Sequence, residues 1–164
     1  MLETFLKLFD VDFFELGEAF KGLKDENVWK RPAPGLLSVG EIAGHISYWF
    51  ALRLAGDAKD PDSCKVTSPL IDRRFRYYPA TLNELPSEQH LAMTAEQVHN
   101  ELTRVHKESV AHFKALNPDL STAPPALPDW SYGSQLEYLV FHIAYHTGQI
   151  YSARHLLGEE TVDN

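Results

Sequence analysis

Two histidines four residues apart, His142 and His146, stand within an apolar pattern near the end of the chain. In an α-helix, this spacing brings both imidazoles to one face, about one turn apart, where they can share a metal ion. His146 falls inside the apolar stripe and His142 at its edge, so both side chains should point inward. The stripe consists of Leu139, Ile143 and Ile150. An inward histidine is more often a hydrogen-bonded core residue than a ligand, so the pair alone leaves both interpretations open.

A third histidine, His45, is expected to face the same interior from another helix. Ser38 and Glu41 have the spacing of a capping box, which satisfies backbone N–H groups at a helix start. In the helix that follows, His45 falls between Ile42 and Trp49 on the face that should be buried. Three neutral imidazoles from two helices would form an open divalent site, with a position left for water or substrate. Such ligands suit zinc, nickel, copper or iron alike.

The other histidines and the single cysteine indicate no second site. His155 lies in the last turn of the final predicted helix, where a cation favours the helix dipole. Cys64 lies in a stretch rich in Asp, Pro and Ser and is interpreted as an ordinary loop thiol. The remaining histidines are expected at the surface: His90, His99, His106 and His112.

Apolar residues at steps of three and four predict four helices that must position these histidines. The predicted helices cover residues 2–23, 38–56, 94–116 and 131–158, whereas the proline-containing stretch 24–37 should hold no regular element. A connection over 57–93 joins the second and third helices and is long enough to contain short elements or to cross the bundle. The prediction is an all-α, four-helix up-down bundle that forms one domain over residues 1–164.

Composition and charge exclude several classes of partner. The chain has 164 residues, 44% of them hydrophobic, which suits one buried core. Its formal net charge of -8 would repel a nucleic-acid backbone. We find no apolar run long enough for a membrane span and no secretory layout at the start, so we expect a soluble, cytoplasmic protein.

Several motifs together resemble a known family. They are WKRP at 29–32, SVGEIAGHI at 38–46, HIAYHTGQI at 142–150 and LLG at 156–158. In order and spacing, they are similar to those of the DinB/YfiT-like family of metal-dependent enzymes. The resemblance implies a four-helix bundle, often a homodimer, in which His45, His142 and His146 bind one divalent ion such as zinc or nickel.

The resemblance also implies a class of reaction. Relatives include S-transferases that add bacillithiol, glutathione or similar thiols to electrophiles, and a mycothiol-dependent isomerase. The isomerase type carries Glu at the position of His142, which favours the transferase interpretation here. The partners would then be a small thiol and an electrophile. A metal-dependent hydrolase, a non-catalytic metal-binding stress protein and a metal-free bundle remain as alternatives.

A few residues outside the histidines are candidates for substrate binding or orientation. Arg73, Arg74 and Arg76 lie in the basic and aromatic segment 73–78, which could hold a substrate carboxylate or simply anchor a solvated loop. Gln149 could orient a ligand or only make a packing contact. Glu41 could accept a hydrogen bond from His45, although its capping role already accounts for it.

Overall fold

The chain folds into four long helices and several short ones. The computed structural model describes residues 1–78 and 84–162, and within these ranges it contains no strand. The long helices are α1 (Leu2–Phe20), α3 (Val39–Ala55), α5 (Ala95–Leu116) and α6 (Tyr132–Leu156). The short ones are α2 (Asp25–Val28), α4 (Glu88–Leu91) and the 3₁₀ turns η1 (Pro61–Ser63) and η2 (Arg73–Phe75). The all-α prediction is confirmed, but α2 falls in the stretch predicted to be irregular.

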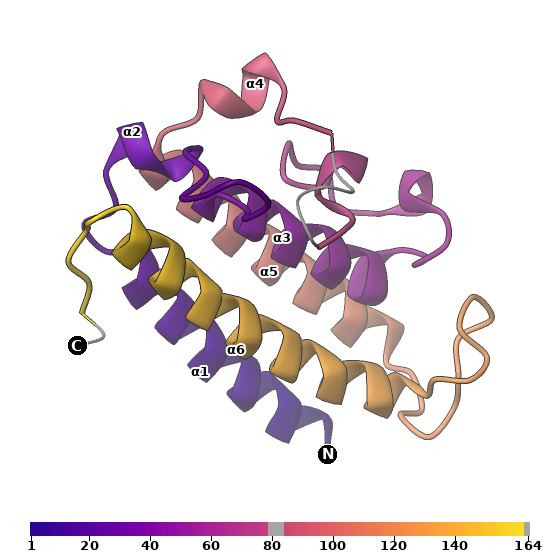
Figure 1. Ribbon diagram of the computed structural model, residues 1–164. Coiled ribbons are helices and arrows are strands. Elements are labelled where there is room, and N and C mark those ends of the chain that lie inside the picture. The colour runs from indigo at the N-terminus through magenta and orange to yellow at the C-terminus, as the bar shows by residue number, and fades with distance from the viewer. Residues whose placement is uncertain (79–83, 163–164) are drawn as a thin grey trace.

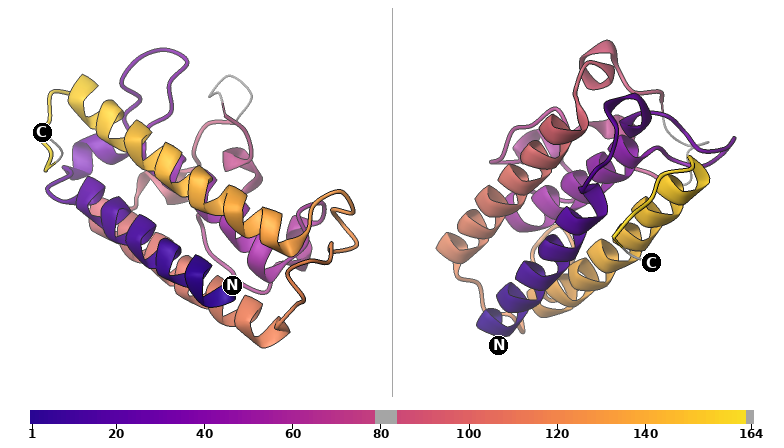
Figure 2. Two further views of the ribbon diagram at one scale, coloured as in Figure 1. Left: turned by 90° about the horizontal axis from the view of Figure 1, so that it is seen from below. Right: turned by 90° about the vertical axis from the view of Figure 1, so that its left-hand side faces the viewer.

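The long helices differ from strict up-down order in one step. Helices α1 and α6 lie side by side and run in one direction, while α3 and α5 pack together and run in the other (Figures 1 and 2). Two consecutive long helices are therefore parallel, so the connection between them must return along the whole bundle. Its last residues bring the start of α5 back beside α2, where Asp25 Oδ1 accepts a hydrogen bond from Ala95 N at 2.9 Å. This return accounts for the unusual length of the connection, of which residues 79–83 lie outside the described part.

Side-chain caps define where three of the four long helices begin. The capping box predicted at Ser38 is confirmed at the start of α3, and a second one at Thr94 starts α5. Helix α6 is capped by Ser131, whose hydroxyl accepts from Ser134 N at 3.1 Å. At the end of α3, Gly56 has extended rather than left-handed backbone angles, φ -156° and ψ -151°. The fixed start of α3 matters most here, because it sets the direction in which His45 points.

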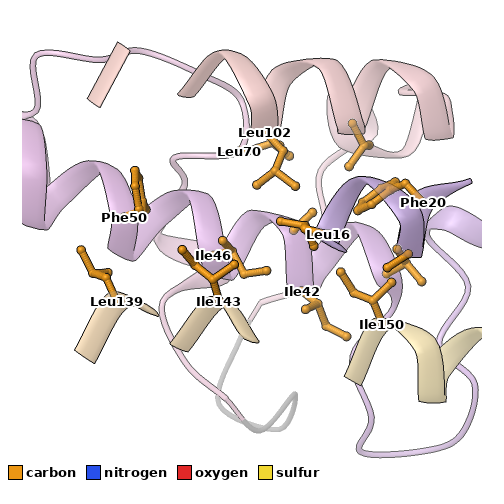
Figure 3. Close-up of a cluster of buried hydrophobic side chains, with 14 of the residues drawn as sticks. Leu16, Phe20, Ile42, Ile46, Phe50, Leu70, Leu102, Leu139, Ile143 and Ile150 are labelled. Atoms are coloured by element: carbon orange, nitrogen blue, oxygen red, sulfur yellow. The ribbon is translucent and has the colours of Figure 1, made fainter. Parts of the chain in front are cut away.

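One apolar core joins the four long helices. Figure 3 shows Leu16, Ile46, Leu102 and Ile143 converging from α1, α3, α5 and α6 respectively, with Leu70 added from the connection. All five of these side chains are fully buried or nearly so. Burial of aliphatic side chains contributes roughly 1.5–3 kcal/mol each, so this shared core holds α3 and α6 in fixed register.

A buried ion pair locks the end of α6 to the end of α1. Arg154 Nε donates to Glu159 Oε2 at 2.8 Å, and Arg154 Nη1 donates to the carbonyls of Ala19 and Lys21 at 2.7 and 2.9 Å. These carbonyls belong to the C-terminal end of α1, where helices leave acceptors unpaired. Arg154 therefore holds the end of α6 against the end of α1.

Among the described residues, no helix is long and apolar enough to cross a membrane.

Candidate metal centre

The three predicted histidines meet between α3 and α6. His45 comes from α3, and His142 and His146 come from adjacent turns of the antiparallel α6. Their ring centroids lie 5.1 Å (His45–His142), 4.7 Å (His45–His146) and 4.4 Å (His142–His146) apart. All three are buried, with 3–6% of each residue exposed. The tertiary structure therefore unites the two sequence motifs in one cluster.

The cluster has the dimensions of a divalent metal site. One ring nitrogen from each histidine lies within 4.8 Å of the others, and the Nε2 atoms of His142 and His146 are 3.1 Å apart. Tetrahedral zinc with metal–nitrogen distances of about 2.0–2.1 Å requires ligand nitrogens about 3.3 Å from one another. Small side-chain rotations span the difference. Without an ion, the same approach is short enough for one hydrogen bond between His142 and His146, for which one of the two neutral rings must carry its single proton on Nε2.

Neighbouring acceptors fix which nitrogen of two histidines faces the cluster. His45 Nδ1 lies 2.7 Å from the carbonyl oxygen of Phe75, to which its N–H donates. His146 Nδ1 lies 2.6 Å from Gln149 Oε1 and donates to it in the same way. With the proton on Nδ1, the Nε2 lone pair of each ring is left for an ion, as in most protein metal sites. By contrast, His142 Nδ1 is buried without a hydrogen-bond partner among the described residues.

Burial keeps the three imidazoles neutral. Desolvation, together with the nearby His45, lowers the pKa of His146 to about 4, and the bond to Gln149 opposes the shift. The pKa of His142 is also lowered strongly, first by burial and then by His146, His45 and Arg53. Burial lowers the pKa of His45 as well. Metal binding requires unprotonated imidazole, so these shifts favour an ion at neutral pH.

A comparison with known protein families agrees with this geometry. The family model of the DinB superfamily matches residues 15–150, a range that contains all three histidines. The chain belongs to the DinB superfamily. No curated protein and no solved structure matched it.

In this DinB superfamily chain, the long connection supplies part of the candidate metal centre. Phe75 in η2 is buried, and its ring lies against Gly44, where a Cβ atom would collide with it. This close approach brings the Phe75 carbonyl to His45. Trp49 Nε1 donates to the carbonyl of the next residue, Arg76, at 2.9 Å. Neither backbone contact could be predicted from the sequence, because a carbonyl acceptor has no residue signature.

The predicted substrate-binding residues have different surroundings. Arg73 pairs with Asp62 at 3.1 Å and Arg74 with Asp72 at 2.9 Å, while Arg76 lies over the ring of Tyr77. Their proposed contact with an anionic substrate stays a prediction. Gln149 contacts His146 directly, as described above.

Glu41 does not hold His45. Its carboxylate accepts from Ser38 N at 2.9 Å and pairs with Arg31, whose Nε lies 3.0 Å from Oε2. The hydrogen bond from His45 is accepted by the Phe75 carbonyl and not by Glu41. Its bonds to Ser38 and Arg31 hold the start of α3, and with it the helix that carries His45.

Two histidines predicted at the surface are buried. His90, in α4, lies under the ring of Phe75, and its Nε2 donates to the carbonyl of Pro69 at 2.8 Å. His106, in α5, stacks on Phe13 of α1. A polar helix face for His106 and a loop position for His90 predict exposure, but neither takes account of aromatic neighbours from other elements. His112 and His155 are exposed and His99 is half-buried.

Aromatic rings that were not predicted as site residues surround the histidines. Tyr138 stacks on His142 with centroids 5.5 Å apart, and Tyr145 lies edge-on to His146 at 5.1 Å. Tyr78 from the connection lies 5.6 Å from the ring of His146. Tyr138 stands one turn before His142, a spacing that could have indicated the contact. The rings give the metal centre an apolar border that carries hydroxyl groups.

Proposed function

We propose that this chain is a divalent-metal-dependent thiol S-transferase. In this proposal, His45, His142 and His146 hold one zinc or nickel ion, and the reaction joins a low-molecular-weight thiol to an electrophile. The observation that carries the proposal is the meeting of three buried, neutral imidazoles with two of the Nε2 atoms oriented by outer acceptors. Three protein ligands leave a coordination position open, which is typical of catalytic rather than structural sites.

The charge of the ligand set favours an anionic partner. Neutral imidazoles leave the two positive charges of an ion uncompensated, in contrast to sites that include carboxylates or thiolates. A divalent ion in such a site lowers the pKa of a bound thiol, so that thiolate is available at neutral pH. Thiolate sulfur is also a favourable ligand for zinc.

The protein's own residues would orient the reactants. The Phe75 carbonyl and Gln149 keep the Nε2 atoms of His45 and His146 directed at one point. Tyr78 and Tyr145 are 36% and 50% exposed, so their rings can meet an apolar electrophile from solvent. Arg73, Arg74 and Arg76 remain proposed contacts for a carboxylate on that electrophile.

We also propose that the protein is a cytoplasmic homodimer. Large apolar residues are exposed on two helices that pack together: Val11 and Phe14 on α1, and Phe141 and Tyr145 on α6. Burial of such residues between two copies would remove apolar surface from water. Light scattering of the purified chain would distinguish a dimer from a monomer.

Metal content is the first test of the proposed function. Protein purified without an affinity tag is subjected to elemental analysis alongside His146→Ala, and His112→Ala serves as a control because His112 is exposed. We expect about one ion per chain in wild type and in the control, and loss of the ion in His146→Ala. Wild type that neither contains nor takes up zinc or nickel would contradict the proposal.

Turnover distinguishes the alternatives that use the same site. Metal-loaded protein is incubated with bacillithiol or glutathione and a chlorodinitrobenzene, and separately with a nitrophenyl ester. Metal-dependent thioether formation would support the transferase, whereas metal-dependent ester cleavage without thiol would support the hydrolase. Tight metal binding with neither reaction across a panel of substrates would favour the non-catalytic metal-binding bundle.

A further inference from the structure

A cavity lies at the end of the bundle where α3 and α5 finish and α6 begins. Its volume is about 620 Å³, which is enough for a small organic molecule. Most of its wall is apolar, with contributions from Leu116 at the end of α5 and from the proline-rich residues 124–127 that precede α6. Arg53, Lys65 and His112 also line it.

Two of the lining side chains hold hydrogen-bond donors that have no acceptor. Arg53 Nε and Nη1 and Gln135 Nε2 are buried, and none of the three atoms has a hydrogen-bond partner among the described residues. Gln135 is only 2% exposed. A buried donor without a partner is destabilising by about 1–3 kcal/mol, and more for a charged group. Two residues of the cavity wall therefore carry buried donors that have no acceptor.

Aromatic rings hold the Arg53 guanidinium in place without satisfying its N–H groups. Its central carbon lies 4.8 Å from the ring centroid of Tyr138, 5.2 Å from Trp130 and 5.6 Å from Trp49. Cation–π contacts of this kind stabilise a cation through the ring faces and leave its in-plane donors free. Burial lowers the pKa of Arg53, although an arginine keeps its charge at neutral pH.

The fixed charges around the cavity are mainly positive. Lys65 and His112 add a cation and a titratable imidazole to Arg53. The carboxylate of Asp57 also lines the cavity, but its Oδ1 already accepts from Lys59 N at 2.7 Å. An anion in the cavity would therefore meet net attraction as well as unused donors.

We propose that this cavity binds a small amphipathic carboxylate, with the carboxylate on Arg53 and Gln135 and the apolar part against Leu116 and residues 124–127. In the structure these donor atoms are covered, so binding requires the ends of both side chains to turn toward the cavity. The guanidinium then forms charge-assisted hydrogen bonds of the kind that make arginine the preferred carboxylate ligand. The proposal concerns a site separate from the three histidines and does not depend on catalysis there.

One side chain connects a lining residue of the cavity to the candidate metal centre. Tyr138 contacts the Arg53 guanidinium at 4.8 Å and stacks on His142 at 5.5 Å. A carboxylate that moves Arg53 therefore acts on a ring that borders the metal ligands. This arrangement allows occupancy of the cavity to be sensed at the metal centre through Tyr138.

Calorimetric titration of the full chain with octanoate and, separately, with octan-1-ol tests the proposal. The two probes have the same apolar chain but differ in charge. Octanoate should bind one site per chain with a dissociation constant below about 1 mM, and octan-1-ol at least about tenfold more weakly. Arg53→Met should weaken octanoate at least about tenfold, because charge-assisted hydrogen bonds contribute about 1.5–3 kcal/mol each. Lys107→Met removes a positive charge from an exposed position of α5 and should leave octanoate binding unchanged.

Two more variants locate the ligand even if Arg53→Met does not fold. Ala126→Trp should weaken octanoate by filling the cavity, since Ala126 lines it. His146→Ala should retain octanoate binding, because the carboxylate is not bound at the metal centre. The proposal is overturned if wild type shows no octanoate binding, if octan-1-ol binds equally well, if Ala126→Trp binds normally, or if His146→Ala abolishes binding.

Discussion

Replacing Gln149 by Leu should weaken metal binding without removing any of the three ligands. Gln149 Oε1 is the acceptor for His146 Nδ1 at 2.6 Å, and this bond leaves Nε2 unprotonated toward the cluster. Loss of such an outer partner typically lowers metal affinity by about 10- to 100-fold. Because Gln149 is only half-buried, water can partly replace its oxygen. We therefore expect a loss near the lower limit, about tenfold or 1.4 kcal/mol.

Competition with a chromophoric zinc chelator at neutral pH measures this effect. Gln149→Glu is the matched control, because it keeps the shape and an acceptor oxygen and adds a negative charge, so its affinity should equal or exceed that of wild type. His146→Ala gives the larger loss expected from removal of a ligand. Unchanged affinity in Gln149→Leu, or an equal loss in Gln149→Glu, would show that the hydrogen bond does not orient His146.

Three other substitutions test different parts of the structure. Gly44→Ala should weaken zinc binding in the same competition assay, because its Cβ collides with the Phe75 ring, whereas Gly148→Ala, with open space around it, should not. Arg154→Met should lower the free energy of unfolding in urea by about 3–5 kcal/mol, since it leaves the buried partner carboxylate unpaired. Burial lowers the pKa of His106 from 6.5 to about 4, so its contribution to stability is present above pH 6.5 and is lost as the pH falls toward 4. His106→Leu should therefore lose less stability than wild type between pH 7 and pH 5, by about 2 kcal/mol in urea titrations.

Each of these results has an outcome that would contradict its reasoning. Equal zinc affinity in the two glycine variants would mean that the connection does not support His45. A loss below about 1 kcal/mol in Arg154→Met would mean that the ion pair is no stronger than an exposed one. A pH dependence of stability unchanged by His106→Leu would show that this histidine is protonated equally in the folded and unfolded chain.

The inward placement of the three candidate metal ligands could be predicted because its signal is local. The spacing of His142 and His146 needs only the geometry of one helix, and the capping box at Ser38 fixes the face on which His45 lies. The family-like motifs carry the same local information. Burial of His90 and His106 could not be read in this way, since it depends on Phe75 and Phe13, which come from other elements.

Local patterns of residue types were enough to predict the four long helices and the inward direction of the three histidines, because apolar period and capping act within a few residues. The parallel course of α3 and α5 emerged from the fold alone, since the path of a long connection depends on packing over the whole bundle. The tertiary structure also decided that the Phe75 carbonyl orients His45 and that Arg53 lines a cavity with unused donors. Such features depend on backbone atoms and side chains brought together from distant segments, and no local pattern of residue types encodes them.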